Sequence, residues 1–173
     1  MTRRPPTAKQ QPAGRRRVPQ SAVQDPLTAA LQRYADRGVF RGFRAEPAAR
    51  GRIEYRFLWL TKQPMSAVFD TRAARLTFPS LLPQVDHEIA ADMKAISGAR
   101  FERGQPEHRR VDARRCRITA AARKGDFSMT VDIRGANHDY AVSKALNIVN
   151  EMFVTLHEHH PEYLIRHFGI STE

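Results

Sequence analysis

Apolar and polar side chains alternate along two stretches of the chain. In RIEYRFLWL, residues 52–60, the aromatic side chains of Tyr55, Phe57 and Trp59 recur at every second position, and in FSMTVDI, residues 127–133, every second residue is again apolar. A period of two is typical of a β-strand that buries one face. The shorter runs MSAVFD, RLTF and RRCRITAAA predict three further strands, and the turn RKGD joins the last of them to FSMTVDI as a hairpin.

Three other segments carry apolar residues at helical spacing. The first begins at Asp25, whose side chain can cap a helix, and the second begins at Asp86. The longest runs from about Asp139 to His160 and carries an apolar stripe at i, i+4, i+7 and i+8 spacing. Pro161 then either stops this helix or starts a short terminal one.

The order of these elements is helix, three strands, helix, two strands, helix. Because tight turns join neighbouring strands, we expect an α+β fold with a mostly antiparallel five-stranded sheet and helices packed on one face. Residues 1–24 are rich in Pro, Gln and Arg and have little to bury, so they are predicted to form a disordered basic tail. Residues 25–173 then form a single α+β domain, a usual domain size.

This element order resembles the small α/β sandwich of the type III secretion chaperones and of the YbjN-like proteins, over about residues 25–160. Those chaperones are usually acidic homodimers. A second resemblance lies in the strings LTFPSLLP, EHRRVDARR and DYAVSKALNIVNEMF, within about residues 70–165, which are similar to a group of uncharacterised bacterial proteins. That likeness implies a bacterial single-domain protein and transfers no functional residues.

The net charge of +11 is concentrated in two places. Residues 1–25 carry six Lys or Arg against one acid, and residues 100–124 carry nine against three, whereas residues 125–173 carry three against seven acids. Basic stretches favour anionic partners such as nucleic acid, although a charged surface also serves solubility. In the tail, the adjacent Arg15, Arg16 and Arg17 could form a non-specific phosphate-binding arm.

The middle basic segment offers a second candidate edge for anions or nucleic acid, because arginine binds phosphate through two parallel hydrogen bonds. The alternative is that Asp112 pairs with one of these arginines inside a structured loop. The segment has little aromatic interleaving, which single-strand binding uses. The candidate contact residues are Arg109, Arg110, Arg114, Arg115 and Arg117.

A third candidate surface is aromatic. Tyr55, Phe57 and Trp59 are expected to be core residues first, but they would form a protein interface if their sheet face were open. Cys116 falls on the apolar side of its predicted strand, so we expect a buried structural thiol.

The sequence LHEHHPEYLIRHFG raises a question of metal binding. A zinc site needs three or four converging ligands, and His157, His160 and His167 do not provide a recognised ligand spacing. The competing interpretation is a helix end, where cationic side chains complement the helix dipole. We expect the helix end, and predict no metal, cofactor or catalytic residue.

Three hypotheses for function remain. The first is a non-enzymatic, chaperone-like or adaptor module that binds a protein partner or a second copy of itself as a homodimer. The second is a nucleic-acid-associated protein that uses the tail and residues 109–117. The third is a small metal-dependent enzyme at the C-terminal histidines. No run of about 18 apolar residues is present, and one cysteine allows no internal disulfide, so we expect no membrane span and a cytoplasmic location.

Overall fold

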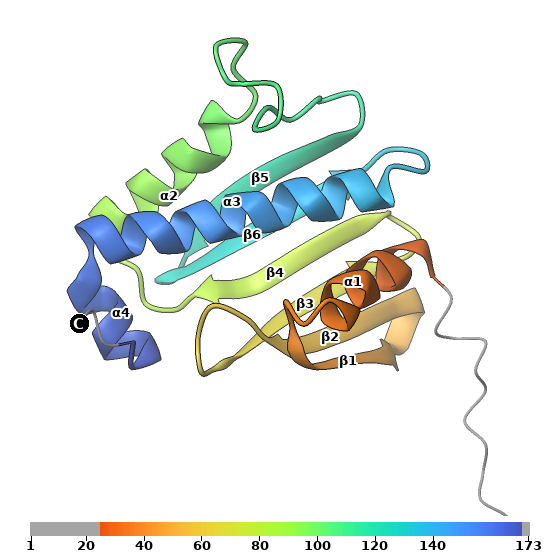
Figure 1. The fold of residues 1–173 in the computed structure, drawn as a ribbon, viewed down its shortest axis with the longest axis horizontal. Coiled ribbons are helices and arrows are strands. Elements are labelled where there is room, and N and C mark those ends of the chain that lie inside the picture. Colours follow the sequence, from red (N-terminus) through yellow and green to blue (C-terminus); the bar gives the residue numbers. More distant parts are fainter. Residues whose placement is uncertain (1–24, 171–173) are drawn as a thin grey trace, which may run out of the picture.

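The computed structural model describes residues 25–170 of the chain (Figure 1). Within this range it contains four α-helices, six strands and one 3-10 turn. The predicted tail, with Arg15, Arg16 and Arg17, lies outside the described residues. In chain order the elements are α1 (Pro26–Asp36), β1 (Arg41–Ala48), η2 (Ala49–Gly51), β2 (Arg52–Leu58), β3 (Pro64–Asp70), β4 (Arg75–Leu82), α2 (His87–Ala99), β5 (Cys116–Arg123), β6 (Asp126–Ile133), α3 (His138–His159) and α4 (Pro161–Phe168).

The strands form one antiparallel sheet in the order β1-β2-β3-β4-β6-β5. The α+β class is therefore confirmed, whereas the expected count of five strands is wrong. The missed strand is β1, which lies at the sheet edge and contains Gly42 and Pro47. Only one of its two edges is paired, so it tolerates residues that weaken a central strand, and none of its side chains is fully buried. Its sequence consequently has no clear alternation.

One face of the sheet is apolar and the helices cover it. Figure 1 shows α1 in front of β2 and β3, and α3 running across β6, with α2 beside β5. Asp25 caps α1 by accepting a hydrogen bond from Leu27 N at 2.8 Å, as its position predicted. A short terminal helix does follow α3, because Pro161 starts α4 and Gly169, with φ 61°, ends it.

The burial of β2 corrects the predicted aromatic interface. Tyr55 and Phe57 are 0% and 1% exposed, and the Tyr55 hydroxyl lies 2.7 Å from Oγ1 of Thr28 in α1. Trp59 is partly buried and packs edge-on against Phe40, with ring centroids 5.6 Å apart. The aromatic face of β2 is thus covered by α1 and is not open in this chain, so the condition for the predicted interface is not met at Tyr55 and Phe57.

The opposite face of the sheet is polar and carries a row of alternating charges, which we call the charge row. In the strand register Arg52 pairs with Asp70, Asp70 with Arg75, Arg75 with Asp132, and Asp132 with Arg117. Nε of Arg75 donates a 2.6 Å hydrogen bond to Oδ1 of Asp132. Each carboxylate in the row therefore has an arginine on both neighbouring strands.

Candidate functional site

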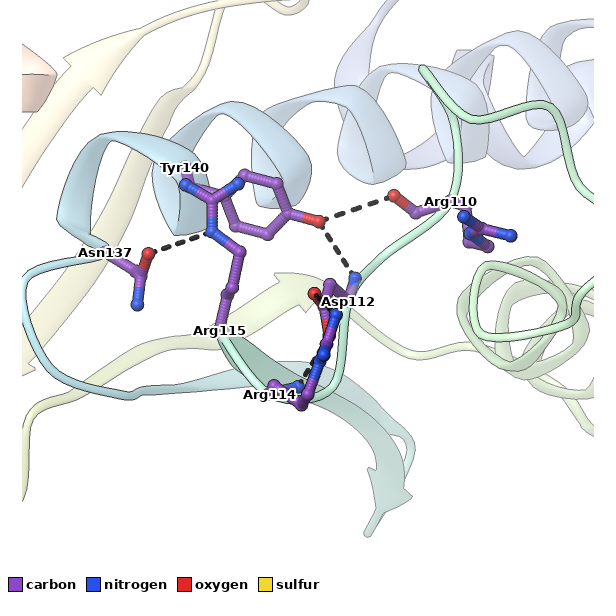
Figure 2. Close-up of polar contacts among 6 residues, drawn as sticks. All are labelled: Arg110, Asp112, Arg114, Arg115, Asn137 and Tyr140. Carbon is purple, nitrogen blue, oxygen red and sulfur yellow. Dashed lines mark hydrogen bonds and ion pairs between the residues drawn. The ribbon is translucent and has the colours of Figure 1, made fainter.

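The basic segment between α2 and β5 has no regular secondary structure but is anchored to the fold. Val111 is 3% exposed, and its backbone N–H donates to the carbonyl oxygen of Arg100 at 2.8 Å. The hydroxyl of Tyr140 in α3 accepts a 2.8 Å hydrogen bond from the N–H of Asp112 (Figure 2). We call residues 100–115 the basic loop. These contacts hold it beside the N-terminal half of α3.

Two of the arginines that were predicted to bind anions, Arg114 and Arg115, already form hydrogen bonds to neighbouring side chains (Figure 2). Arg114 donates two hydrogen bonds to Asp112, at 3.1 and 3.0 Å, and this pairing lowers the pKa of the Asp112 carboxyl. Arg115 donates to Oδ1 of Asn137 at 2.9 Å, and its guanidinium carbon lies 3.6 Å from the centre of the Tyr140 ring. The alternative that Asp112 pairs inside a structured loop is confirmed.

The other three candidate arginines, Arg109, Arg110 and Arg117, differ in whether they form an ion pair. Arg109 forms an ion pair with Glu151 of α3, with 3.2 Å between Nη2 and Oε2. Arg110 and Arg117 are exposed, and within residues 25–170 neither forms an ion pair. Contact with nucleic acid or phosphate stays a prediction for these side chains.

A buried cation beneath the basic loop is the feature that sequence reasoning missed. The side chain of Arg100, at the end of α2, is 5% exposed and forms an ion pair with Oε2 of Glu151. Its Nη1 donates to the carbonyl oxygen of Arg109 at 3.1 Å. The pKa of Arg100 is lowered mainly by burial and to a smaller extent by the positive charge of Arg109. A single carboxylate thus faces two guanidiniums, through ion pairs and not through well-aligned hydrogen bonds.

Lys144 adds a third cation to this region of α3. Its Nζ donates to the carbonyl oxygen of His108 at 2.7 Å. The pKa of Lys144 is lowered mainly by burial and to a smaller extent by the positive charge of Arg100. The negative charge of Glu107 partly opposes this lowering. Positive charge therefore exceeds negative charge where the basic loop meets α3.

Beside these groups lies a polar pocket of about 280 Å³ between the basic loop and α3. We call it the polar pocket. Amide groups of α3, a histidine and both guanidiniums surround it, so its wall is rich in hydrogen-bond donors. Its lining residues are Arg100, His108, Arg109, Asn147, Asn150, Glu151 and Val154.

An apolar groove of about 460 Å³ lies next to it, between α3, α4 and the turn after β2. We call it the apolar groove. Val154 and Leu60 are 46% and 37% exposed in its wall, although large apolar side chains are usually buried. Its lining residues are Leu60, Asn150, Phe153, Val154, His157, Glu158, Leu164 and Ile170.

Leu60 is held at this groove in an unusual backbone conformation. Its φ is 62°, in the left-handed region that favours glycine. The N–H of Thr61 donates to the carbonyl oxygen of Trp59 at 2.7 Å, which closes a three-residue turn around Leu60. Turns of this kind are rare and strained, and strain of this kind concentrates at functional sites.

The polar pocket and the apolar groove meet on one helix face. Both are lined by Asn150 and Val154. Asn147, Asn150, Val154 and His157 follow one another at i, i+3, i+7 and i+10, which places them on a single exposed stripe of α3. The stripe carries two amides in its N-terminal half, and its one apolar member, Val154, lies in its C-terminal half at the apolar groove.

The C-terminal histidines lie at a helix end, as expected. His157 and His159 occupy the last turn of α3, and Nε2 of His160 lies 2.8 Å from Oδ2 of Asp92 in α2. His159, His160 and His167 line a third pocket, of about 530 Å³. Among residues 25–170 no group of three or more His, Cys, Asp or Glu side chains is placed to hold a metal ion.

Cys116 begins β5 and is fully buried, which confirms the predicted burial of its thiol. Burial raises its pKa to about 11, against the smaller and opposite effects of Arg115 and Lys144. A thiol with so high a pKa is almost wholly protonated at neutral pH, so it is a poor nucleophile.

Comparisons with family models, with curated proteins and with solved structures find no match to this chain. In the part of the chain described by the structure, none of the helices is long and apolar enough to cross a membrane. The exposed stripe of α3 and its two hollows are therefore the features of this chain that bear on function.

Proposed function

We propose that this chain is a non-enzymatic protein-binding module that holds a partner segment on the exposed stripe of α3. The observation that supports the proposal most directly is the apolar groove, whose wall exposes Val154 and Leu60. Exposed apolar side chains that line one hollow are typical of a surface that a partner covers. This moves the expected interface from β2 to the other side of the helix layer.

The conformation of Leu60 gives the proposal independent support. Glycine or asparagine would adopt φ 62° at lower cost than leucine. A leucine in this place lowers the stability of the free chain but adds an apolar side chain to the groove. Contacts between the Leu60 side chain and a bound partner would offset this loss of stability, which explains why a leucine occupies this position.

Nucleic-acid binding is the second candidate, and the exposed Arg110 and Arg117 favour it. It ranks lower because Arg109, Arg114 and Arg115 already have intramolecular partners that an incoming phosphate would have to displace. Binding of the full-length chain to a random duplex DNA or single-stranded RNA, with affinity falling steeply as salt rises, would favour this candidate.

A selection from a displayed library of random dodecapeptides against the full-length chain tests the proposal. Peptides that bind are then measured with the Val154→Asp variant, in which a charge replaces the methyl groups at the centre of the groove. We expect at least a tenfold loss of affinity by fluorescence anisotropy, because apolar contacts near the centre of an interface dominate binding.

The matched control is Val39→Asp, at the connection between α1 and β1. Val39 is 40% exposed and does not line the apolar groove, so the same substitution there leaves peptide affinity unchanged. If no selected peptide distinguishes Val154→Asp from Val39→Asp, the groove does not bind peptides and the proposal fails. Loss of a dimer in Val154→Asp, seen by sedimentation velocity, would instead identify a second copy as the partner.

A further inference from the structure

The polar pocket suggests what kind of segment the apolar groove accepts. Arg100 and Arg109 face a single carboxylate, Glu151, and the amides of Asn147 and Asn150 complete the wall. A buried guanidinium is costly unless charge and hydrogen bonds satisfy it. Because one carboxylate oxygen is shared by two cations, the pocket retains positive charge and free donor groups that a second carboxylate would match.

The size and position of the pocket suit a side chain. A volume of about 280 Å³ is room for a carboxyl group and its neighbouring carbons. His108 and Arg109, at the rim, are exposed, so a chain can pass over the pocket and continue instead of ending inside it. An Asp or Glu side chain within a segment fits this opening.

The spacing along α3 sets the distance between the two anchoring points. Asn147 in the polar pocket and His157 in the apolar groove are ten residues apart, which at about 1.5 Å per residue is about 15 Å along the helix. Val154, which lines both hollows, is seven residues from Asn147, or about 10 Å along the helix. An extended chain advances about 3.3 Å per residue, so three to five residues reach from the polar pocket to the part of the groove between Val154 and His157.

We propose that the partner is an extended peptide segment with an Asp or Glu side chain three to five residues away from its apolar anchors. The acid enters the polar pocket between Arg100 and Asn147, and the apolar side chains fill the groove around Val154. This inference rests on the proposed function, since both use the same stripe of α3.

The test begins with the sequences of the dodecapeptides selected against the full-length chain. We expect Asp or Glu to be enriched three to five positions from an apolar pair. One such peptide, labelled with fluorescein, is compared with its counterpart in which the acid is replaced by the matching amide. We expect the amide to weaken binding to the wild-type chain about tenfold, the effect of losing a partly buried ion pair.

Two variants of the chain then locate the acid. Arg109→Gln removes a rim cation whose side chain is 46% exposed, so the fold is retained, and in this variant the amide and acid peptides should differ less than threefold. Arg110→Gln removes the same charge from the next residue, which does not line the polar pocket, and the tenfold difference should persist.

The outcomes separate this inference from the proposed function. If peptides depend on Val154 but bind equally well with acid or amide, the acidic segment is wrong while peptide binding stands. If the acid matters equally in wild type, Arg109→Gln and Arg110→Gln, it is bound elsewhere and the assignment to the polar pocket is wrong. If no peptide depends on Val154, both proposals fail.

Discussion

The charge row and the basic loop are both rich in arginine, yet their charges are balanced differently. On the sheet, Arg52, Arg75 and Arg117 alternate with Asp70 and Asp132, so each acid has a basic neighbour on either side. Beneath the basic loop, two guanidiniums share the carboxylate of Glu151, and Lys144 adds a third cation nearby. The comparison shows that the net charge of the chain says little about where a negatively charged group can bind.

Burial separates the two regions further. The charge row is open to solvent, where water and salt screen each pair. The side chain of Arg100 is 5% exposed, so its interaction with Glu151 is screened less and its loss is more costly. Equal substitutions in the two regions should therefore have unequal effects on stability.

The largest effect is expected for Glu151→Ala. This variant leaves the buried Arg100 without its carboxylate, and removing one partner of a buried ion pair costs about 3 kcal/mol of unfolding free energy. Urea unfolding followed by circular dichroism measures the change. An unfolding free energy within about 0.5 kcal/mol of wild type would contradict the view that Glu151 neutralises a buried cation.

A double variant, Arg100→Met with Glu151→Leu, controls for this interpretation. Apolar side chains of similar volume remove both charges together, and such replacements are often neutral or stabilising. We expect the double variant to regain most of the stability that Glu151→Ala loses. If it is as unstable as Glu151→Ala, packing around Glu151 and not its charge explains the loss.

The pKa of the Cys116 thiol is affected both by burial in the core and by the cations of the basic loop and α3. Arg115 and Lys144 lower the pKa of its thiol, but burial outweighs them and raises it to about 11 from an ordinary value of 9.0. At pH 8 the folded chain should thus hold about one hundredth of the thiolate of the unfolded chain, and alkylation by iodoacetamide should slow in proportion.

The sign of the linked pH effect follows from the same pKa. A folded-state pKa above the unfolded value means that the folded chain retains its proton longer. The stability that the neutral thiol contributes is complete below about pH 9 and is lost as the pH rises to about 11. Cys116→Ala serves as the control in both experiments. Alkylation of the native thiol as fast as in urea would show that Cys116 is accessible.

Local patterns predicted the sheet far better than they predicted the site. Strict alternation identified β2 and β6, because a strand with one buried face must repeat every two residues. It could not identify β1, whose edge position relaxes that requirement. Alternation also predicted that β4 ends at Phe78, because proline usually interrupts a strand, whereas β4 continues to Leu82. Its pairing with β6 is irregular between Phe78 and Leu82, and a proline is tolerated at such an irregularity.

The site depends on contacts that no local pattern contains. Arg100 follows the last residue of α2 and Glu151 lies in α3, more than fifty residues later, so they meet only in the fold, where α2 packs against α3. The single local signal was Val154, an apolar residue on the otherwise polar stripe formed by Asn147, Asn150 and His157. An apolar residue on the exposed side of an amphipathic helix is a modest indication of an interface.

The smallest effect is expected for Arg75→Gln in the charge row. The variant removes the 2.6 Å hydrogen bond to Asp132, but Arg117 lies opposite Asp132 on the other neighbouring strand, so Asp132 keeps a cationic neighbour. We expect the shift of the urea midpoint to be about a fifth of that of Glu151→Ala or less, and to vanish in about 1 M salt, where exposed charges are screened within about 3 Å. A shift as large as that of Glu151→Ala and insensitive to salt would mean that the charge row does not behave as an exposed row of alternating charges, and the contrast between the two regions would then be lost.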